Sequence, residues 1–172
     1  MPTSLSQEQQ FTHLLESHKK LVFKIANAYC SDREERKDLI QEIVLQLWKA
    51  FPRYDSRYAV STWMYRIALN VAISYYRKES RRKSKTVHPK EAIIDLAEDD
   101  QERLAEKESR IGQLYQWINQ LGELDKALMI LYLEGKSHQE IAEILGISKS
   151  NVGTKISRNK RKLTHHFHNI QQ

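Results

Sequence analysis

Apolar residues recur every three or four positions along most of the 172-residue chain, which is the period of an amphipathic α-helix. In the front half this spacing predicts helices over about residues 6–29, 32–51 and 62–79. In the rear half it predicts two short helices over about residues 111–118 and 124–133. No alternating stretch is long enough to predict a strand, so the expected fold class is all-α.

Two tetrapeptides have the form of a capping box, in which a serine at the helix N-cap and a glutamate three residues later satisfy each other's backbone amides. "SDRE" at residues 31–34 predicts that the second helix begins there. "SHQE" at residues 137–140 predicts another helix that begins at Ser137. Pro52 is expected to end the second helix, because proline cannot continue one.

The stretch "KSHQEIAEILGISKSNVGTKISRNKRKL", from Lys136 to Leu163, predicts a helix-turn-helix. Gly146 is expected to take the positive φ that the turn requires, and Ser148 to cap the second helix. That helix offers side chains that pair with bases or phosphates in a DNA major groove: Lys149, Ser150, Asn151, Thr154, Lys155 and Arg158. The alternative is an amphipathic helix whose basic side merely faces water. The two caps, the glycine turn and the basic face together favour DNA binding.

The second predicted helix carries a polar edge beside its apolar seam, in "DLIQEIVLQLW" at residues 38–48. Asp38, Gln41 and Glu42 form this acidic and amide edge. It is either a solvated helix face or a docking edge for a basic partner helix, and the charge pattern alone leaves both readings open.

The loop at residues 53–61 and the helix after it interleave aromatic with basic residues. Aromatic rings stack on unpaired bases while basic side chains hold the phosphates, which is how single-stranded nucleic acid is bound. Trp63 and Tyr75 are expected to be core residues. Four other tyrosines are less easily all buried: Tyr54, Tyr58, Tyr65 and Tyr76.

The overall composition is that of a soluble globular protein, with 40% hydrophobic and 29% charged residues. A net charge of +6 and a pI near 9.3 favour a polyanionic partner. Cys30 is the only cysteine, which excludes an intrachain disulfide and a CxxC zinc site and fits a reducing cytoplasm. The N-terminus and the absence of a long apolar run predict neither a signal peptide nor a membrane span.

The charge changes sign abruptly in the middle of the chain. Residues 77–90 hold seven Lys or Arg against one Glu, and residues 91–108 hold eight Asp or Glu against two Lys or Arg. Such runs seldom belong to a packed core, so residues 84–107 are expected to be a flexible acidic linker between domains at residues 6–83 and 108–168.

Taken in order, "DLIQEIVLQLW", "STWMYRIALNVAISYYRKESRR", the acidic linker and "SHQEIAEILGISKSNVGTKISRNKRKL" resemble a bacterial RNA polymerase sigma factor. The resemblance is to the extracytoplasmic-function (ECF) group of the sigma-70 family, and it covers residues 10–165. It implies that residues 6–83 are region 2 and residues 108–168 are region 4. It further implies a protein that is not an enzyme and needs no cofactor, because the polymerase performs the chemistry.

The resemblance also implies three sets of site residues. Docking on the β′ coiled coil of core polymerase falls to Asp38, Leu39, Gln41, Glu42 and Ile43. Melting and capture of the −10 element fall to Arg53, Tyr54, Arg57, Tyr58, Arg66, Asn70, Tyr75, Tyr76 and Arg77. Reading of the −35 element falls to the six residues of the predicted recognition helix. The implied partners are core RNA polymerase, through its β′ coiled coil and β flap, promoter DNA both duplex and melted, and an anti-sigma factor.

Two other functions compete with that of a sigma factor. A helix-turn-helix activator that acts without docking on core polymerase would need an α/β receiver domain, for which no strand pattern appears. A DNA recombinase would need a nucleophile and clustered arginines in the front half.

"HHFH" at residues 165–168 could bind a metal ion, but without a carboxylate or thiolate at matched spacing a frayed helix end is favoured.

Overall fold

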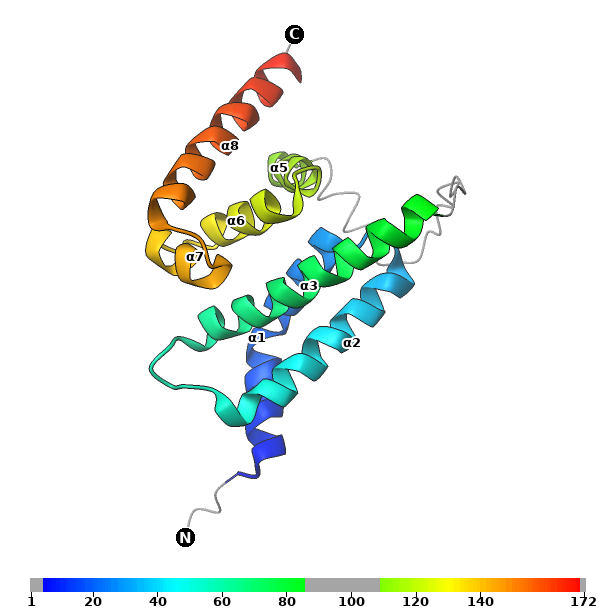
Figure 1. Cartoon of the computed structure of the whole chain (residues 1–172), viewed down its shortest axis with the longest axis vertical. Coiled ribbons are helices and arrows are strands. Elements are labelled where there is room, and N and C mark those ends of the chain that lie inside the picture. Colours follow the sequence, from blue (N-terminus) through cyan, green and yellow to red (C-terminus); the bar gives the residue numbers. More distant parts are fainter. Residues whose placement is uncertain (1–4, 86–108, 171–172) are drawn as a thin grey trace.

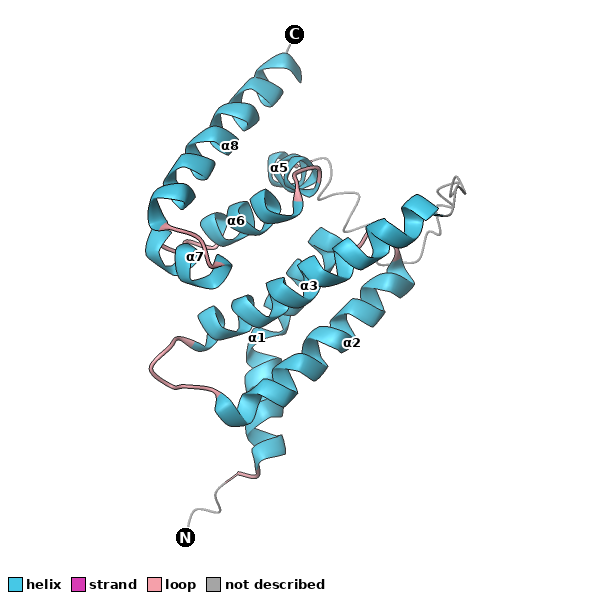
Figure 2. Ribbon diagram, in the orientation of Figure 1, coloured by secondary structure: helices cyan, strands magenta, loops and turns pink. Residues whose placement is uncertain are grey.

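The computed structural model describes residues 5–85 and 109–170. The helices there are α1 (Gln7–Tyr29), α2 (Arg33–Ala50), a 3-10 helix (Phe51–Arg53), α3 (Val60–Lys85), α5 (Arg110–Asn119), α6 (Glu123–Leu133), α7 (His138–Leu145) and α8 (Lys149–Ile170). Every regular element within these two ranges is a helix (Figure 2), so the all-α prediction is confirmed. None of these helices combines the length and the apolar character needed to cross a membrane. Residues 84 and 85 of the predicted linker belong to α3, and the rest of it lies outside the described residues.

The second helix begins one residue later than a Ser31 cap would place it. Asp32 is the N-cap, and its carboxylate accepts hydrogen bonds from the backbone amides of Glu34 and Glu35, both at 3.0 Å. The predicted Ser31–Glu34 capping box is therefore wrong. A carboxylate that accepts two amide hydrogen bonds, next to the positive end of the helix dipole, makes the stronger cap.

The helix-turn-helix has the local structure that its sequence predicts. The Ser137 hydroxyl accepts from the Glu140 amide at 3.1 Å, and the Glu140 carboxylate accepts from the Ser137 amide at 2.7 Å, which completes the capping box. Gly146 ends α7 with φ of 67°, in the left-handed region. The Ser148 hydroxyl then accepts from the Asn151 amide at 3.1 Å and starts α8.

Helices α1, α2 and α3 pack as a front bundle (Figure 1). The side chains that α2 buries completely are Leu39, Ile43 and Leu47. Phe11 closes one end of this core, with its ring edge-on to Trp48 at 5.1 Å and to Phe51 at 5.4 Å between centroids. Burial of this apolar surface is the main force that holds the three helices together.

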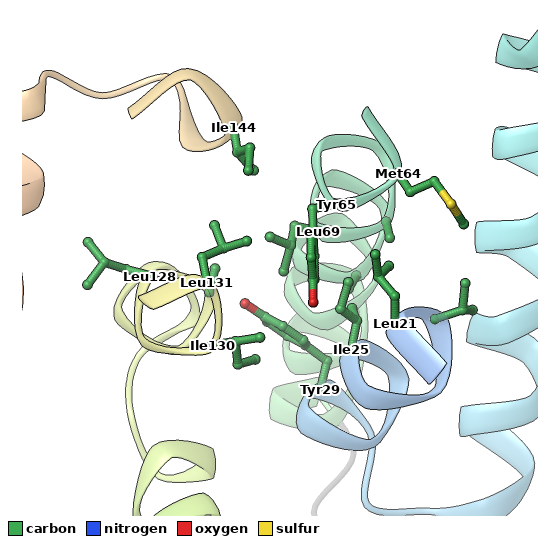
Figure 3. Close-up of a cluster of buried hydrophobic side chains, with 14 of the residues drawn as sticks. Leu21, Ile25, Tyr29, Met64, Tyr65, Leu69, Leu128, Ile130, Leu131 and Ile144 are labelled. Atoms are coloured by element: carbon green, nitrogen blue, oxygen red, sulfur yellow. The ribbon is translucent and has the colours of Figure 1, made fainter. Parts of the chain in front are cut away.

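Helices α5 to α8 form the rear domain, and its core is continuous with that of the front bundle. Helices α6 and α7 lie against α3, and α5 contacts α1. Figure 3 shows Ile130 and Leu131 of α6 on the side of that helix that faces Tyr29 of α1. The two domains that the charge pattern separates along the sequence therefore pack on each other in space.

Candidate nucleic-acid interface

The predicted docking residues on α2 divide into anchors and a polar edge. Leu39 and Ile43 have no exposed surface, so they hold α2 in the bundle and cannot touch a partner directly. Asp38 and Gln41 are exposed and Glu42 is half-buried. Helical periodicity thus presents two carboxylates and an amide from a helix that its own apolar seam fixes in place.

A groove of about 730 Å³ runs between α2 and α3 beside this edge. It is lined by Asp38, Glu42, Gln46, Ala50, Ile67, Asn70, Val71, Ser74, Tyr75 and Lys78. Two residues predicted to dock on the polymerase and two predicted to bind −10 DNA thus meet in one groove. Within it, the Gln46 side-chain amide donates to the Glu42 carboxylate at 2.8 Å and so orients that carboxylate.

Lys78 was absent from the predicted −10 set, although it lines the groove. It follows Asn70 by eight residues and Ser74 by four, so the helical period could have found it.

The loop between α2 and α3 presents three exposed residues of the −10 set and one that is partly buried. Arg53, Arg57 and Tyr58 are exposed, and the Tyr58 side chain is the most open aromatic of the group, with 55% of its surface accessible. The Tyr54 ring packs on Trp63 at 4.9 Å between centroids, and its hydroxyl donates to the Tyr58 carbonyl at 2.6 Å. Tyr54 therefore shapes the loop, whereas Tyr58 is free to stack on a base.

One of the loop's cations already has a partner within the chain. The Arg57 guanidinium pairs with Asp55 at 2.6 Å, and this contact holds the pKa of the Asp55 carboxyl below its usual range. Both groups face solvent, so the pair is weak and nucleic-acid phosphate can compete for Arg57.

On α3, Arg66 and Asn70 lie four residues apart on the helix surface, and both are exposed. Tyr75 is half-buried, as expected of a core residue, and burial together with nearby Cys30 raises the pKa of its hydroxyl to about 12. Tyr65, expected to be among the more accessible tyrosines, is buried, because α6 and α7 cover its side of α3. Arg77 is exposed but pairs with Glu123 of α6 at 2.6 Å.

The predicted recognition helix α8 exposes five of its six expected DNA-binding residues: Lys149, Ser150, Asn151, Thr154 and Arg158. Lys155 is the exception, because it pairs with Asp125 of α6 at 3.4 Å and keeps only 19% of its side chain exposed. The 22 residues of α8 include no Asp or Glu, and Lys160, Arg161 and Lys162 extend the basic surface. The face is therefore positive along its length and suits a phosphate backbone.

The C-terminal histidines and the cysteine lie apart from these surfaces. His165 and His168 line a shallow hollow on α8 together with Lys160, Arg161 and Thr164. Among residues 5–85 and 109–170, no three His, Cys, Asp or Glu side chains are grouped so that they could hold a metal ion. Cys30 is buried at the C-cap of α1.

Each half of the chain matches a known protein family. The Sigma-70 region 2 family matches residues 14–82, and the Sigma-70 region 4 family matches residues 111–163. The chain is 24% identical over 169 residues to the ECF RNA polymerase sigma factor SigX of Bacillus subtilis strain 168, covering 96% of this chain and 87% of that protein.

Two solved structures share the fold. One is the sigma factor RpoE in complex with the anti-sigma factor NepR from Bartonella quintana, with a TM-score of 0.70 and 19% identity, covering 91% of this chain and 95% of the other. The second is CnrH in complex with the cytosolic domain of CnrY, with a TM-score of 0.65 and 19% identity, covering 93% of this chain and 88% of the other.

Proposed function

Because the chain belongs to the ECF group of the sigma-70 family of RNA polymerase sigma factors, we propose that it binds core RNA polymerase and directs the enzyme to promoters that carry −10 and −35 elements. The observation that carries this proposal is the pairing of a basic helix-turn-helix with a region 2 bundle in one chain. The polymerase performs the chemistry, and this chain selects where transcription begins. A helix-turn-helix activator that never docks on core polymerase would leave the region 2 match without a role.

We assign region 2 to residues 6–83 and region 4 to residues 108–168. In region 2, the α2 edge of Asp38, Gln41 and Glu42 is proposed to receive basic side chains of the β′ coiled coil. The edge lies on a helix anchored by buried Leu39 and Ile43, and this supports the assignment, since a surface that is held in place before binding loses less conformational entropy on association. Region 4 is proposed to contact the β flap.

Melted −10 DNA is proposed to lie along the loop and the exposed side of α3. Tyr58 offers a ring on which a base can stack, while Arg53 and Arg66 can hold phosphates on either side of it. Asn70 offers an amide that can donate to and accept from a base edge. Tyr54 and Tyr75, both partly buried, are proposed to support this surface rather than to touch DNA.

The duplex −35 element is proposed to receive the N-terminal half of α8 in its major groove. Asn151 has the amide that pairs bidentately with adenine, and Arg158 has the guanidinium that pairs bidentately with guanine. Lys149 and Thr154, both exposed, are proposed to contact phosphates. Lys155 is the least available of the set because of its pairing with Asp125.

We further propose that an anti-sigma factor restrains this chain. The support is the likeness in fold, over more than nine-tenths of the chain, to a sigma factor that was solved together with an anti-sigma factor.

A mobility-shift experiment with promoter fragments tests whether promoter binding requires both this chain and core polymerase. We expect the chain with core polymerase to retain promoter DNA that neither component retains alone at the same concentration. Specific retention of duplex DNA by the chain alone, unaffected by core polymerase, would instead indicate an activator.

A further inference from the structure

The exposed face of α8 that carries the proposed −35 residues continues beyond Arg158. Helix α8 runs unbroken to Ile170 (Figure 1). Positions three or four residues apart lie on one face of a helix. Followed from the first base-reading side chain, this spacing selects residues that are all exposed: Asn151, Thr154, Arg158, Arg161, His165 and His168. The face that presents base-reading side chains at one end of α8 therefore presents two histidines at the other.

These histidines line a hollow of about 400 Å³ on the surface of α8. Its lining residues all belong to this one helix, and they are Lys160, Arg161, Thr164, His165 and His168. The Thr164 hydroxyl donates to the Lys160 carbonyl at 3.0 Å, and the Asn169 side-chain nitrogen lies 3.3 Å from Nε2 of His165. The 22 residues of α8 include no Asp or Glu. The hollow is therefore surrounded by cations and imidazoles, and it suits an anion.

The charge of the hollow depends on pH through its two imidazoles. Histidine is the side chain that gains a proton, and with it a positive charge, between about pH 8 and pH 5. The other charged or titratable groups near it on α8 are the cations of residues 160–162 and the half-buried His166. From α6, the Tyr132 ring lies 4.6 Å from the Lys160 ammonium, and α7 supplies no lining residue. No carboxylate on α8 thus competes with a ligand for the two histidines.

The length of α8 carries this end of the helix past the major groove. Asn151 and Arg158 are about 10 Å apart along the helix axis, which is close to the width of about 12 Å of the groove. His168 lies about 15 Å further along the same axis. With Asn151 and Arg158 in the groove, the hollow comes to lie over the phosphate strand that borders it.

We propose that this hollow is a second DNA-binding site on region 4, which holds backbone phosphates next to the −35 element when His165 and His168 are protonated. The proposal rests on the proposed function for the position of the N-terminal half of α8 in duplex DNA. Arg161 supplies a positive charge at every pH, and each imidazolium adds one phosphate contact as the pH falls. Affinity for promoter DNA therefore rises in acid without any change in the residues that read bases.

The salt dependence of DNA affinity counts these contacts, because each neutralised phosphate contributes about −0.9 to the slope of log affinity against log salt concentration. Promoter DNA is titrated with the full chain and core polymerase. At about pH 5.5 the slope for the wild type should be steeper by about 1.8 than the slope for the double variant His165→Gln with His168→Gln. At about pH 8 the two slopes should coincide, because the imidazoles are then neutral.

A matched control removes two imidazoles that lie outside the hollow. His13→Gln is at an exposed position on α1, and His166→Gln is on the half-buried side of the same end of α8. This control should keep the wild-type slope at both pH values. Circular dichroism shows whether each variant retains its helices.

The position of the phosphates is tested on the DNA. Uncharged methylphosphonate linkages replace the phosphates that flank the −35 element on both sides. On this DNA the wild type should lose its steeper slope at about pH 5.5 and match the variant that lacks His165 and His168. A difference that persists would place the two histidines away from the flanking backbone and would overturn the site.

Equal slopes for the wild type and the His165 and His168 variant at about pH 5.5 would also overturn it, as would an equal loss of slope in the control. Failure of the proposed function is a separate outcome, seen when no transcript made by core polymerase depends on the protein. The same comparison of slopes, made with the full chain alone on random-sequence duplex DNA, still decides the site. A steeper wild-type slope in acid supports it, whereas equal slopes or no binding refute it.

Discussion

The double substitution Asp38→Arg with Glu42→Arg is expected to abolish docking on core polymerase while leaving the fold intact. Each arginine turns an attraction for a basic partner helix into a repulsion. A charge pair 5 Å apart in an effective dielectric of 20 is worth about 3 kcal/mol, and solvent screening reduces this to below about 1 kcal/mol for exposed Asp38. Glu42 is half-buried and oriented by Gln46, so it retains more of its Coulomb energy.

Because reversal both removes an attraction and adds a repulsion, the two substitutions should together cost at least about 3 kcal/mol of binding free energy. That corresponds to a loss of affinity of more than about 100-fold. Fluorescence anisotropy of labelled protein titrated with core polymerase measures the loss. Glu8→Arg with Glu16→Arg makes the same charge change on α1 and serves as the control. Equal affinities for wild type, control and double variant would refute the docking assignment.

Three further outcomes are expected. Arg158→Ala should lower affinity for −35 duplex DNA by about 1–3 kcal/mol in a titration with core polymerase present, and unchanged affinity would remove Arg158 from the interface. Asn159 is fully buried, and its side-chain nitrogen and oxygen have no hydrogen-bond partner in the structure. Asn159→Leu should therefore raise the free energy of unfolding, measured with urea, by about 1–3 kcal/mol. A lower free energy of unfolding would show that the amide has a partner. Burial raises the pKa of the Tyr29 and Tyr65 hydroxyls above the ordinary value of 10.0. The stability that these groups confer is therefore fully present below pH 10.0 and is lost as the pH rises above it. A free energy of unfolding in urea that stays constant up to about pH 12 would contradict this.

Local features of the fold could be read directly from the sequence. The Ser137 capping box, the positive φ of Gly146 and the Ser148 cap depend on residues within three or four positions of one another, and all three are confirmed. The exposed face of α8 follows from the same short-range period. The second helix start was missed because two acceptors, Ser31 and Asp32, compete at adjacent positions, and the sequence does not rank them.

Features that depend on distant segments could not be predicted. Tyr65 is buried because α6 and α7 cover it, and no pattern near residue 65 signals that cover. Lys155 is engaged by Asp125, which lies 30 residues earlier, and Arg77 by Glu123, which lies 46 residues later. Composition also suggested two independent domains, whereas their docking rests on matched shapes and charges that only the folded chain brings together.

Run-off transcription with purified protein, bacterial core polymerase and a library of genomic promoter fragments tests the central claim most directly. The account predicts discrete transcripts that require this protein, with two shared sequence elements upstream of their start points. Their loss with Asp38→Arg and Glu42→Arg would connect the transcripts to the α2 edge. If no transcript depends on the protein, or if every promoter is transcribed equally with and without it, the assignment as a sigma factor is contradicted.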